Sequence, residues 1–197
     1  MCLKLRMPQL VKKSLTFVTL IALGFILLSL QALAAPHPGT STSMLIAPHK
    51  AAFFARKGFQ LNSGKTEWSI TGDENSSLSE FHLQFTPPKG TALLELNTET
   101  LAQEMSLESY AKKWVRDYPM YGFEVLGTKS FAQNHSKGFI VDLLHRKMKK
   151  QVRQVIFLSG KTSVTLTCAD QMDTFKDSLQ DCNSIIKTFD WIKSPTK

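Results

Sequence analysis

The last quarter of the chain contains a strand-like pattern followed by a helix-like pattern. In segment 162–168 every second residue is apolar, namely Val164, Leu166 and Cys168, which predicts a strand with one buried face. After it, apolar residues recur every three or four positions, at Met172, Phe175, Leu179, Cys182, Ile186 and Phe189. This spacing predicts a helix with one apolar stripe. We therefore expect each cysteine to lie on the core-facing side of its own element.

A second helix is predicted further upstream. Its apolar stripe consists of Leu107, Tyr110, Ala111, Trp114, Val115 and Tyr118. Ser106 precedes the stripe as a capping residue, and Pro119 and Gly122 end the helix. Aromatic residues at this spacing are typical of core packing rather than of a ligand site.

The remaining apolar segments predict the strands of a sheet. They span residues 58–61, 80–85, 92–96, 123–128, 138–146 and 151–158. The last two are apolar on both faces, which is typical of central strands in a sheet that is covered on both sides. Short turns around Lys149 and Gly160 favour antiparallel neighbours. The pattern thus predicts an α+β fold, with an antiparallel sheet flanked by helices.

The N-terminus has the features of an export signal. Four basic residues within the first 13 precede an uncharged apolar run at 14–31, and Ala32-Leu33-Ala34 fits a cleavage site before Ala35. We therefore expect a periplasmic or secreted protein after cleavage. The alternative is an inner-membrane anchor through residues 14–33, because the apolar run is nearly long enough to span a bilayer.

These features divide the chain into three predicted parts: a signal peptide at 1–34, a flexible linker or arm at 35–52 and a single domain at 53–197. The arm is rich in Pro, Ser and Thr, and it contains His37, Met44 and His49. A metal-binding periplasmic protein that uses these side chains is one hypothesis. Two separated histidines in a polar arm are more typical of solvated side chains, so we expect neither a metal nor a cofactor.

Removal of the signal leaves two cysteines, Cys168 and Cys182. An even number of cysteines in an oxidising compartment predicts a disulfide between them. Such a bond would close a loop of about 15 residues and stabilise the fold by roughly 3 kcal/mol. Two buried free thiols are the alternative. A zinc site lacks a second pair of ligands, and a redox pair normally has the closer Cys-x-x-Cys spacing.

The net charge of +8 is concentrated at the N-terminus, because the residues after the first 13 carry 20 basic and 16 acidic side chains. This mild excess does not indicate nucleic-acid binding. One predicted hairpin contains a cluster without an intervening acid, formed by Arg146, Lys147, Lys149, Lys150 and Arg153. The cluster suits an anionic membrane surface, an acidic polysaccharide or an acidic protein. The alternative is a solvated hairpin that discourages edge pairing.

Catalytic signatures are missing from the sequence. It contains no Gly-x-Ser-x-Gly elbow, His-Glu-x-x-His motif or Gly-rich phosphate loop. Asp142 and His145 share a predicted strand, but their odd offset directs the two side chains to opposite faces. We therefore expect a non-enzymatic protein. A periplasmic hydrolase whose site is assembled from distant residues is the alternative.

The order of the segments resembles that of the PsbP-like and DcrB-like envelope proteins. The resemblance covers about 53–191 and rests on residues 58–61 with Trp68, 106–111, 150–157 and 175–189. It implies an α/β/α sandwich and a binding, scaffold or assembly role without catalytic residues. The implied partner is an envelope protein or a membrane surface. The oligomeric state does not follow from it.

Overall fold

The computed structural model describes residues 53–54, 57–72 and 81–192, all of which belong to one compact unit, 41–197. The predicted signal peptide and arm lie outside the described residues, so the boundaries of the three predicted parts stay predictions.

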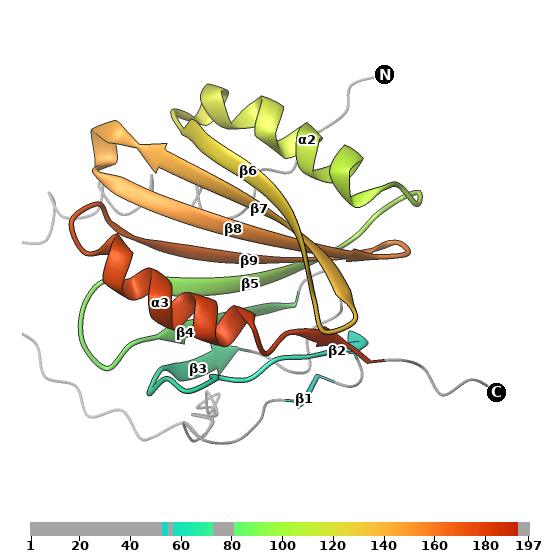
Figure 1. The fold of residues 1–197 in the computed structure, drawn as a ribbon, viewed down its shortest axis with the longest axis horizontal. Coiled ribbons are helices and arrows are strands. Elements are labelled where there is room, and N and C mark those ends of the chain that lie inside the picture. The colour runs from blue at the N-terminus through green and yellow to red at the C-terminus, as the bar shows by residue number, and fades with distance from the viewer. Residues whose placement is uncertain (1–52, 55–56, 73–80, 193–197) are drawn as a thin grey trace, which may run out of the picture. The chain divides into compact units, whose positions relative to one another are not determined.

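An antiparallel sheet of seven strands forms the centre of the fold, in the order β3-β4-β5-β9-β8-β7-β6 (Figure 1). Its strands are β3 (Ser69–Gly72), β4 (His82–Thr86), β5 (Leu93–Thr100), β6 (Glu124–Gln133), β7 (Ser136–His145), β8 (Lys150–Ser159) and β9 (Thr162–Gln171). A small antiparallel sheet contains β1 (Phe53–Phe54), β2 (Phe59–Gln60) and β10 (Asp190–Trp191). The predicted α+β class and the antiparallel pairing are confirmed.

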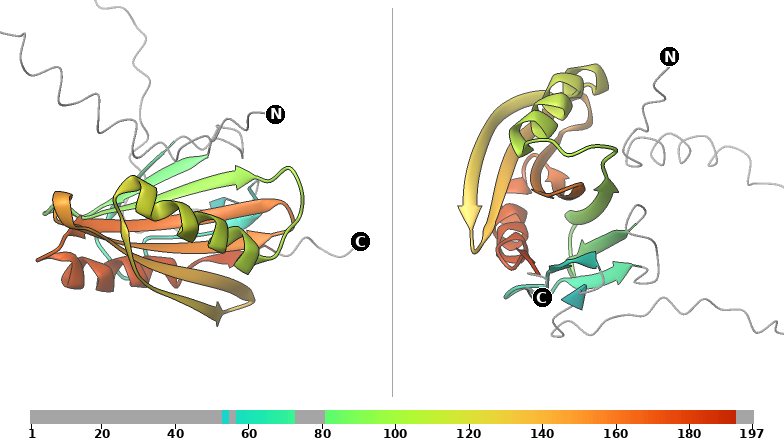
Figure 2. Two further views of the ribbon diagram at one scale, coloured as in Figure 1. Left: turned by 90° about the horizontal axis from the view of Figure 1, so that it is seen from above. Right: turned by 90° about the vertical axis from the view of Figure 1, so that its right-hand side faces the viewer.

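Two helices cover opposite faces of the large sheet (Figures 1 and 2). They are α2 (Leu107–Asp117) and α3 (Phe175–Ile186), and two short 3-10 helices follow α2 and β7, namely η3 (Tyr118–Tyr121) and η4 (Arg146–Met148). The α2 side has a core in which Tyr110 and Ala111 pack against apolar residues of β7 and β8. The larger core on the other side contains Phe175, Cys182 and Ile185 of α3 together with residues of β3, β4, β5, β8 and β9.

The start of α2 follows the predicted cap. The Ser109 N–H donates to Ser106 Oγ at 3.1 Å, which satisfies one of the free N–H groups of the first turn. Further along the helix, the Tyr110 hydroxyl donates to Glu99 of β5 at 2.6 Å. Burial raises the pKa of Tyr110, and the hydrogen bond to Glu99 raises it further. This contact ties α2 to the middle of the sheet.

The helix α3 is shorter than its apolar stripe. Met172 lies in the turn before the helix with 47% of its surface exposed, and Phe189 lies beyond the helix end. Phe189 is nevertheless fully buried, because its ring stacks on Phe157 with the ring centroids 4.0 Å apart. The regular spacing of apolar residues therefore extends beyond both ends of the helix, and at Met172 and Phe189 it does not indicate helical structure.

The central strands are buried on both faces, as predicted for β7 and β8. The expectation of one buried face is wrong for β9, because Ser163 and Thr167 on its other face are also buried. Ser163 Oγ donates to the Tyr110 hydroxyl at 3.2 Å, and Gln154 Nε2 donates to Thr167 Oγ1 at 3.2 Å. Polar side chains can be buried at these positions because each has a hydrogen-bond partner.

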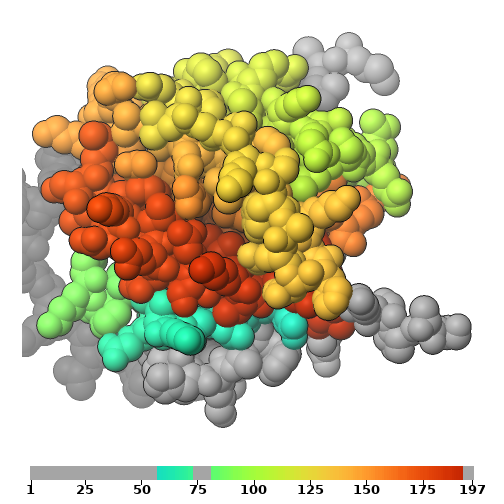
Figure 3. All heavy atoms as spheres, in the orientation of Figure 1, coloured from blue at the N-terminus to red at the C-terminus, as the bar shows by residue number. Residues whose placement is uncertain are grey.

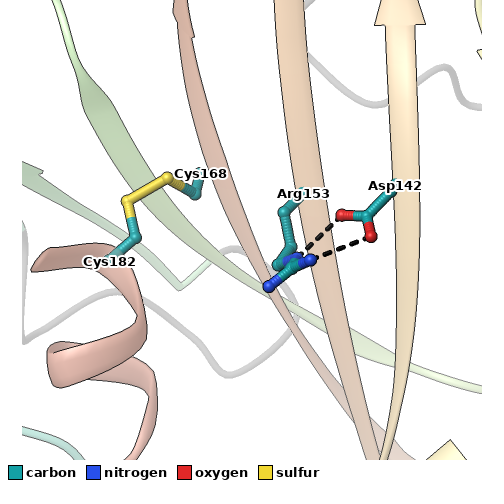
Figure 4. A network of polar contacts seen from close by, with 4 residues as sticks. All are labelled: Asp142, Arg153, Cys168 and Cys182. Atoms are coloured by element: carbon teal, nitrogen blue, oxygen red, sulfur yellow. Dashed lines mark hydrogen bonds and ion pairs between the residues drawn. A yellow bond between two sulfur atoms is a disulfide. The ribbon is translucent and has the colours of Figure 1, made fainter. Parts of the chain in front are cut away.

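Cys168 of β9 and Cys182 of α3 form a disulfide (Figure 4). Their sulfur atoms are 2.08 Å apart and their Cα atoms 6.1 Å apart, and both side chains are fully buried. The bond attaches the middle of α3 to a strand at the centre of the large sheet. It closes a short loop that contains the whole β9–α3 turn.

Removal of the disulfide should leave the fold in place but lower its stability. Reduction of the wild type, or the double substitution Cys168→Ala and Cys182→Ala, is expected to decrease the free energy of unfolding by about 3 kcal/mol, because the unfolded chain regains the loop entropy. Urea denaturation followed by circular dichroism measures this change. Equal stability of the reduced and oxidised protein would contradict a role for the bond in stability.

The N-terminal end of α3 is attached to the sheet through Asp170. This residue is 4% exposed, and its carboxylate accepts hydrogen bonds from Thr91 Oγ1 at 2.7 Å, from Thr174 Oγ1 at 2.8 Å, from Ser178 Oγ and from the Gln171 N–H. Burial by itself would raise the pKa of the Asp170 carboxyl, but the hydrogen bonds that it accepts outweigh burial and lower the pKa.

The lowered pKa gives Asp170 a pH-dependent effect on stability. Its contribution is complete above the ordinary carboxyl pKa of 3.8 and is lost as the pH falls through the lower pKa of the folded state. At pH 7, Asp170→Asn should decrease the free energy of unfolding by roughly 1–3 kcal/mol. Below about pH 4 the difference between wild type and variant should shrink. Urea denaturation at both pH values tests this, and a difference independent of pH would contradict it.

Candidate functional site: the basic hairpin

The predicted basic cluster lies where β7 turns into β8. The chain leaves β7 at His145, passes through η4 and enters β8 at Lys150. The His145 Nδ1 atom accepts a hydrogen bond from the Met148 N–H at 3.2 Å, and Lys149 adopts the left-handed conformation with φ 51°. The Met172 N–H of the β9–α3 turn donates to the Lys149 carbonyl at 2.9 Å. The hairpin is therefore supported by a neighbouring turn.

The structure divides the five basic residues into two groups. Arg153 lies within β8 and forms two hydrogen bonds to Asp142 of β7, at 2.7 and 2.9 Å (Figure 4). Arg146 pairs with Glu124 of β6 at 2.7 Å. Both acids lie outside residues 146–153, on β7 and β6, which is why the cluster itself contains no acid. Among the described residues, the lysines are therefore the members of the cluster without an ion pair.

The three lysines of the hairpin are Lys147, Lys149 and Lys150. In the part of the chain that the structure describes, no ion pair joins any of them to a carboxylate. Lys147 and Lys149 are exposed, and Lys150 is half-buried. A shallow depression beside them is lined by Arg146, Lys149, Gln171, Met172 and Asp173. The hairpin therefore presents positive charge to solvent, with Glu124 paired to Arg146 and Asp173 lining the depression.

Asp142 and His145 have separate partners. The Asp142 carboxylate is occupied by Arg153. The His145 ring lies edge-on to Phe123, with ring centroids 5.0 Å apart, and its Nδ1 atom is occupied by the Met148 N–H. Neither group is placed to exchange a proton with the other, which agrees with the odd offset in the sequence.

A second polar cluster lies on β4 and β5, away from the hairpin. His82 Nδ1 is 2.8 Å from Asn97 Oδ1, and Gln84 Nε2 donates to Glu95 Oε1 at 3.2 Å. The His82 and Glu95 side chains approach to 4.0 Å, which is beyond hydrogen-bond distance. The buried Glu95 Oε2 atom has no hydrogen-bond partner. The His82 imidazole is therefore hydrogen-bonded to Asn97 and not to the Glu95 carboxylate.

Two further hypotheses concern a metal site and a membrane anchor. Within residues 53–54, 57–72 and 81–192, no group of three or more His, Cys, Asp or Glu side chains could hold a metal ion. None of the helices in those ranges is long and apolar enough to cross a bilayer. The histidine and methionine arm and the apolar run at 14–33 lie outside the described residues.

Sequence reasoning missed the apolar side chains that surround the hairpin. Met148 lies in the turn between Lys147 and Lys149, and it is 46% exposed. Met172 was assigned to the helix stripe, although it lies in the turn beside Lys149. The sequence does contain a signal for the exposure of Met148, because it lies between two lysines in a short turn. A side chain at the tip of a turn has few core residues within reach.

Comparison with solved structures identifies the fold. The cyanobacterial PsbP protein (CyanoP) of Synechocystis sp. PCC 6803 superposes with a TM-score of 0.53 and 8% identity over 78% of this chain and 98% of that protein. A protein of unknown function, PA94 of Pseudomonas aeruginosa, matches with a TM-score of 0.48 and 13% identity over 78% of this chain and 99% of its own. No protein-family model matches the sequence, and no curated protein does.

The chain thus has a PsbP-like α+β fold, as the sequence resemblance implied. The match to cyanobacterial PsbP spans nearly the whole of that protein, so the likeness concerns the complete fold rather than one sheet. At 8% identity it shows the fold alone.

The Arg153–Asp142 pair should stabilise the sheet. The two side chains are 22% and 27% exposed and form a two-pronged contact. A double-mutant cycle with Arg153→Gln and Asp142→Asn is expected to give a coupling free energy of about 1 kcal/mol in urea denaturation. Additive effects of the two substitutions would contradict the contact.

Proposed function

We propose that this protein is an exported, non-enzymatic binding protein of the bacterial envelope that contacts an anionic partner through its basic hairpin. The observation that carries the proposal is the set of three lysines, Lys147, Lys149 and Lys150, which have no carboxylate partner among the described residues. The PsbP-like fold supports a role outside catalysis, since the described strands and helices carry no recognisable catalytic constellation.

The shape of the hairpin supports the same proposal. A lysine with a positive φ costs on the order of 1 kcal/mol relative to glycine, yet Lys149 occupies this position. The turn therefore keeps a cationic side chain where a glycine would be less strained. Hydrogen bonds from Met148 to His145 and from Met172 to Lys149 hold the turn in place. Because the turn is already held in one conformation, less conformational entropy of the hairpin is lost when a partner binds.

Two features support a location in the envelope. The N-terminal segment has the order of basic, apolar and small residues that is typical of an export signal. The disulfide between Cys168 and Cys182 suits an oxidising compartment. We infer that the protein acts in the periplasm or outside the cell, and that its partner is an anionic membrane surface or an acidic face of an envelope protein. Nucleic acid is not among the proposed partners.

Charge reversal tests the proposal. The triple variant Lys147→Glu, Lys149→Glu and Lys150→Glu should lower the fraction that binds an isolated envelope preparation at least tenfold, because each lysine near an anionic surface contributes about 1 kcal/mol. Binding of the wild type should decrease as salt screens the charges. Co-sedimentation for the membrane fraction and pull-down for its soluble proteins measure the binding.

The matched control reverses the same number of charges elsewhere. Lys65, Lys129 and Lys137 are exposed and lie outside the hairpin, so their triple change to Glu alters the net charge equally. This control should bind like the wild type if the hairpin is the contact. If both triple variants lose binding to the same extent, only the overall charge matters and the proposed site is excluded. Circular dichroism confirms that each variant is folded.

A further inference from the structure

Exposed apolar side chains gather at the end of the sheet that carries the basic hairpin. The exposed large hydrophobic residues of the described ranges are Met120 (72%), Leu126 (46%), Met148 (46%), Met172 (47%) and Ile192 (36%). All except Ile192 belong to the turns and strand ends around the hairpin. Isolated apolar residues on a surface are ordinary, but a group of them at one place indicates an interaction site.

The strand register places these residues at one end of the molecule. Glu124 pairs with Leu144, His145 pairs with Lys150, and Lys150 pairs with Gln171. The start of β6, the end of β7, the start of β8 and the end of β9 therefore lie abreast. In Figures 1 and 3 the turns at this end, including the orange β7–β8 turn and the red β9–α3 turn, form the left edge of the fold.

Backbone hydrogen bonds connect two of the methionines to the hairpin, and Met120 belongs to the neighbouring η3 segment. Met148 donates through its N–H to His145, and Met172 donates to the carbonyl of Lys149. Met120 belongs to η3, two residues before Gly122, and a Cβ atom on Gly122 would lie 3.0 Å from the His145 ring. His145 is therefore the common neighbour around which the η3 segment and the hairpin meet.

The charges at this end are mostly cationic. Lys147, Lys149 and Lys150 have no ion-pair partner in the described ranges, while Arg146 is neutralised by Glu124. Lys89, exposed in the β4–β5 turn, lies on the same side, because Thr91 of the same turn bonds to Asp170 near the end of β9. Asp170 is occupied by its hydrogen bonds, and two exposed acids lie beside the hairpin, Asp173 and the Glu124 that pairs with Arg146.

Apolar and cationic side chains at one surface favour a lipid bilayer over an acidic protein surface. Methionine side chains are flexible and apolar, so they can enter the irregular boundary between headgroups and acyl chains. Lysines beside them keep their ammonium groups level with the phosphates while their stems remain in apolar surroundings. An acidic protein surface would be matched by the lysines alone and would leave exposed methionines without a function.

We propose that this end docks onto the anionic surface of a bilayer, with Met120, Met148 and Met172 entering the headgroup region and the three lysines contacting lipid phosphates. We call it the membrane-docking end. The inference rests on the proposed function and specifies its anionic partner as a lipid surface. It assigns the contact to the η3 segment and the β9–α3 turn as well as to the β7–β8 hairpin.

Vesicle binding tests the inference. The protein is used as recovered after expression, with its N-terminus determined by mass spectrometry and shared by every variant. The wild type should co-sediment with vesicles of phosphatidylcholine containing about one third phosphatidylglycerol, and much less with phosphatidylcholine alone. The triple variant Met120→Ser, Met148→Ser and Met172→Ser should bind the anionic vesicles about tenfold more weakly. The matched control Ile192→Ser should bind like the wild type.

Insertion is measured separately from binding. A tryptophan introduced by Met148→Trp should be quenched by brominated lipids beyond the quenching of the native tryptophans in the wild type. A tryptophan introduced by Lys137→Trp, at the opposite end of β7, should add no quenching. Equal quenching at both positions, or unchanged binding of the methionine variant, would overturn the proposal.

The two proposals can fail independently. If the lysines are required for binding to the envelope preparation but the protein ignores anionic vesicles, the partner is an acidic protein, and the inference fails while the proposed function stands. If charge reversal at the hairpin leaves envelope binding unchanged, the proposed function fails. In that case a loss of vesicle binding in the methionine variant would mark an apolar contact without a role for the lysines, and the inference would fail as well.

Discussion

The attachment of α3 to the large sheet is the constraint on which the rest of the structure depends. The disulfide between Cys168 and Cys182 fixes the middle of the helix to β9, and the Asp170 carboxylate fixes its first turns through Thr174 and Ser178. At the other end, the hairpin between β6 and β7 donates hydrogen bonds to the carbonyls of Ile186 and Phe189. A disulfide and side-chain hydrogen bonds therefore hold one helix along its length, and the larger core is closed beneath it.

This attachment also supports the candidate site. The turn between β9 and α3 is held at one side by Asp170 and at the other by the disulfide. The same turn supplies the Met172 N–H that bonds to Lys149. Because α3 is attached to the sheet, the β9–α3 turn is held in place, and this turn supports the basic hairpin through the Met172–Lys149 hydrogen bond. The residues that stabilise the fold and those that we propose to bind a partner are separate, but they share this one segment.

The charged residues of the sheet also separate into those that stabilise the fold and those that we propose to bind a partner. Arg153 lies on β8 directly beside Cys168 of β9, and Asp142 lies beside Arg153 on β7, so both face the α3 side. Their pairing satisfies two half-buried charges. Lys147 and Lys149 lie in the turn and Lys150 at the start of β8, and none of the three forms an ion pair with a described carboxylate. A cluster that appears uniform in the sequence consequently contains a structural arginine, a surface ion pair with Glu124 and three cations available to a partner.

Sequence periodicity determined the secondary structure and the fold class. Alternation in β4, β5 and β9, the stripe of α2 and the two-sided apolar strands β7 and β8 each follow from which positions must be buried. Periodicity could not determine where the α3 stripe leaves the helix, because Met172 and Phe189 keep the spacing although one is exposed and the other is stacked on Phe157. Nor could it show which cations are neutralised, since Asp142 and Glu124 reach the arginines across strands. Only the strand register brings together residues so distant in the chain, and it also places the β9–α3 turn with Met172 beside the hairpin with Met148.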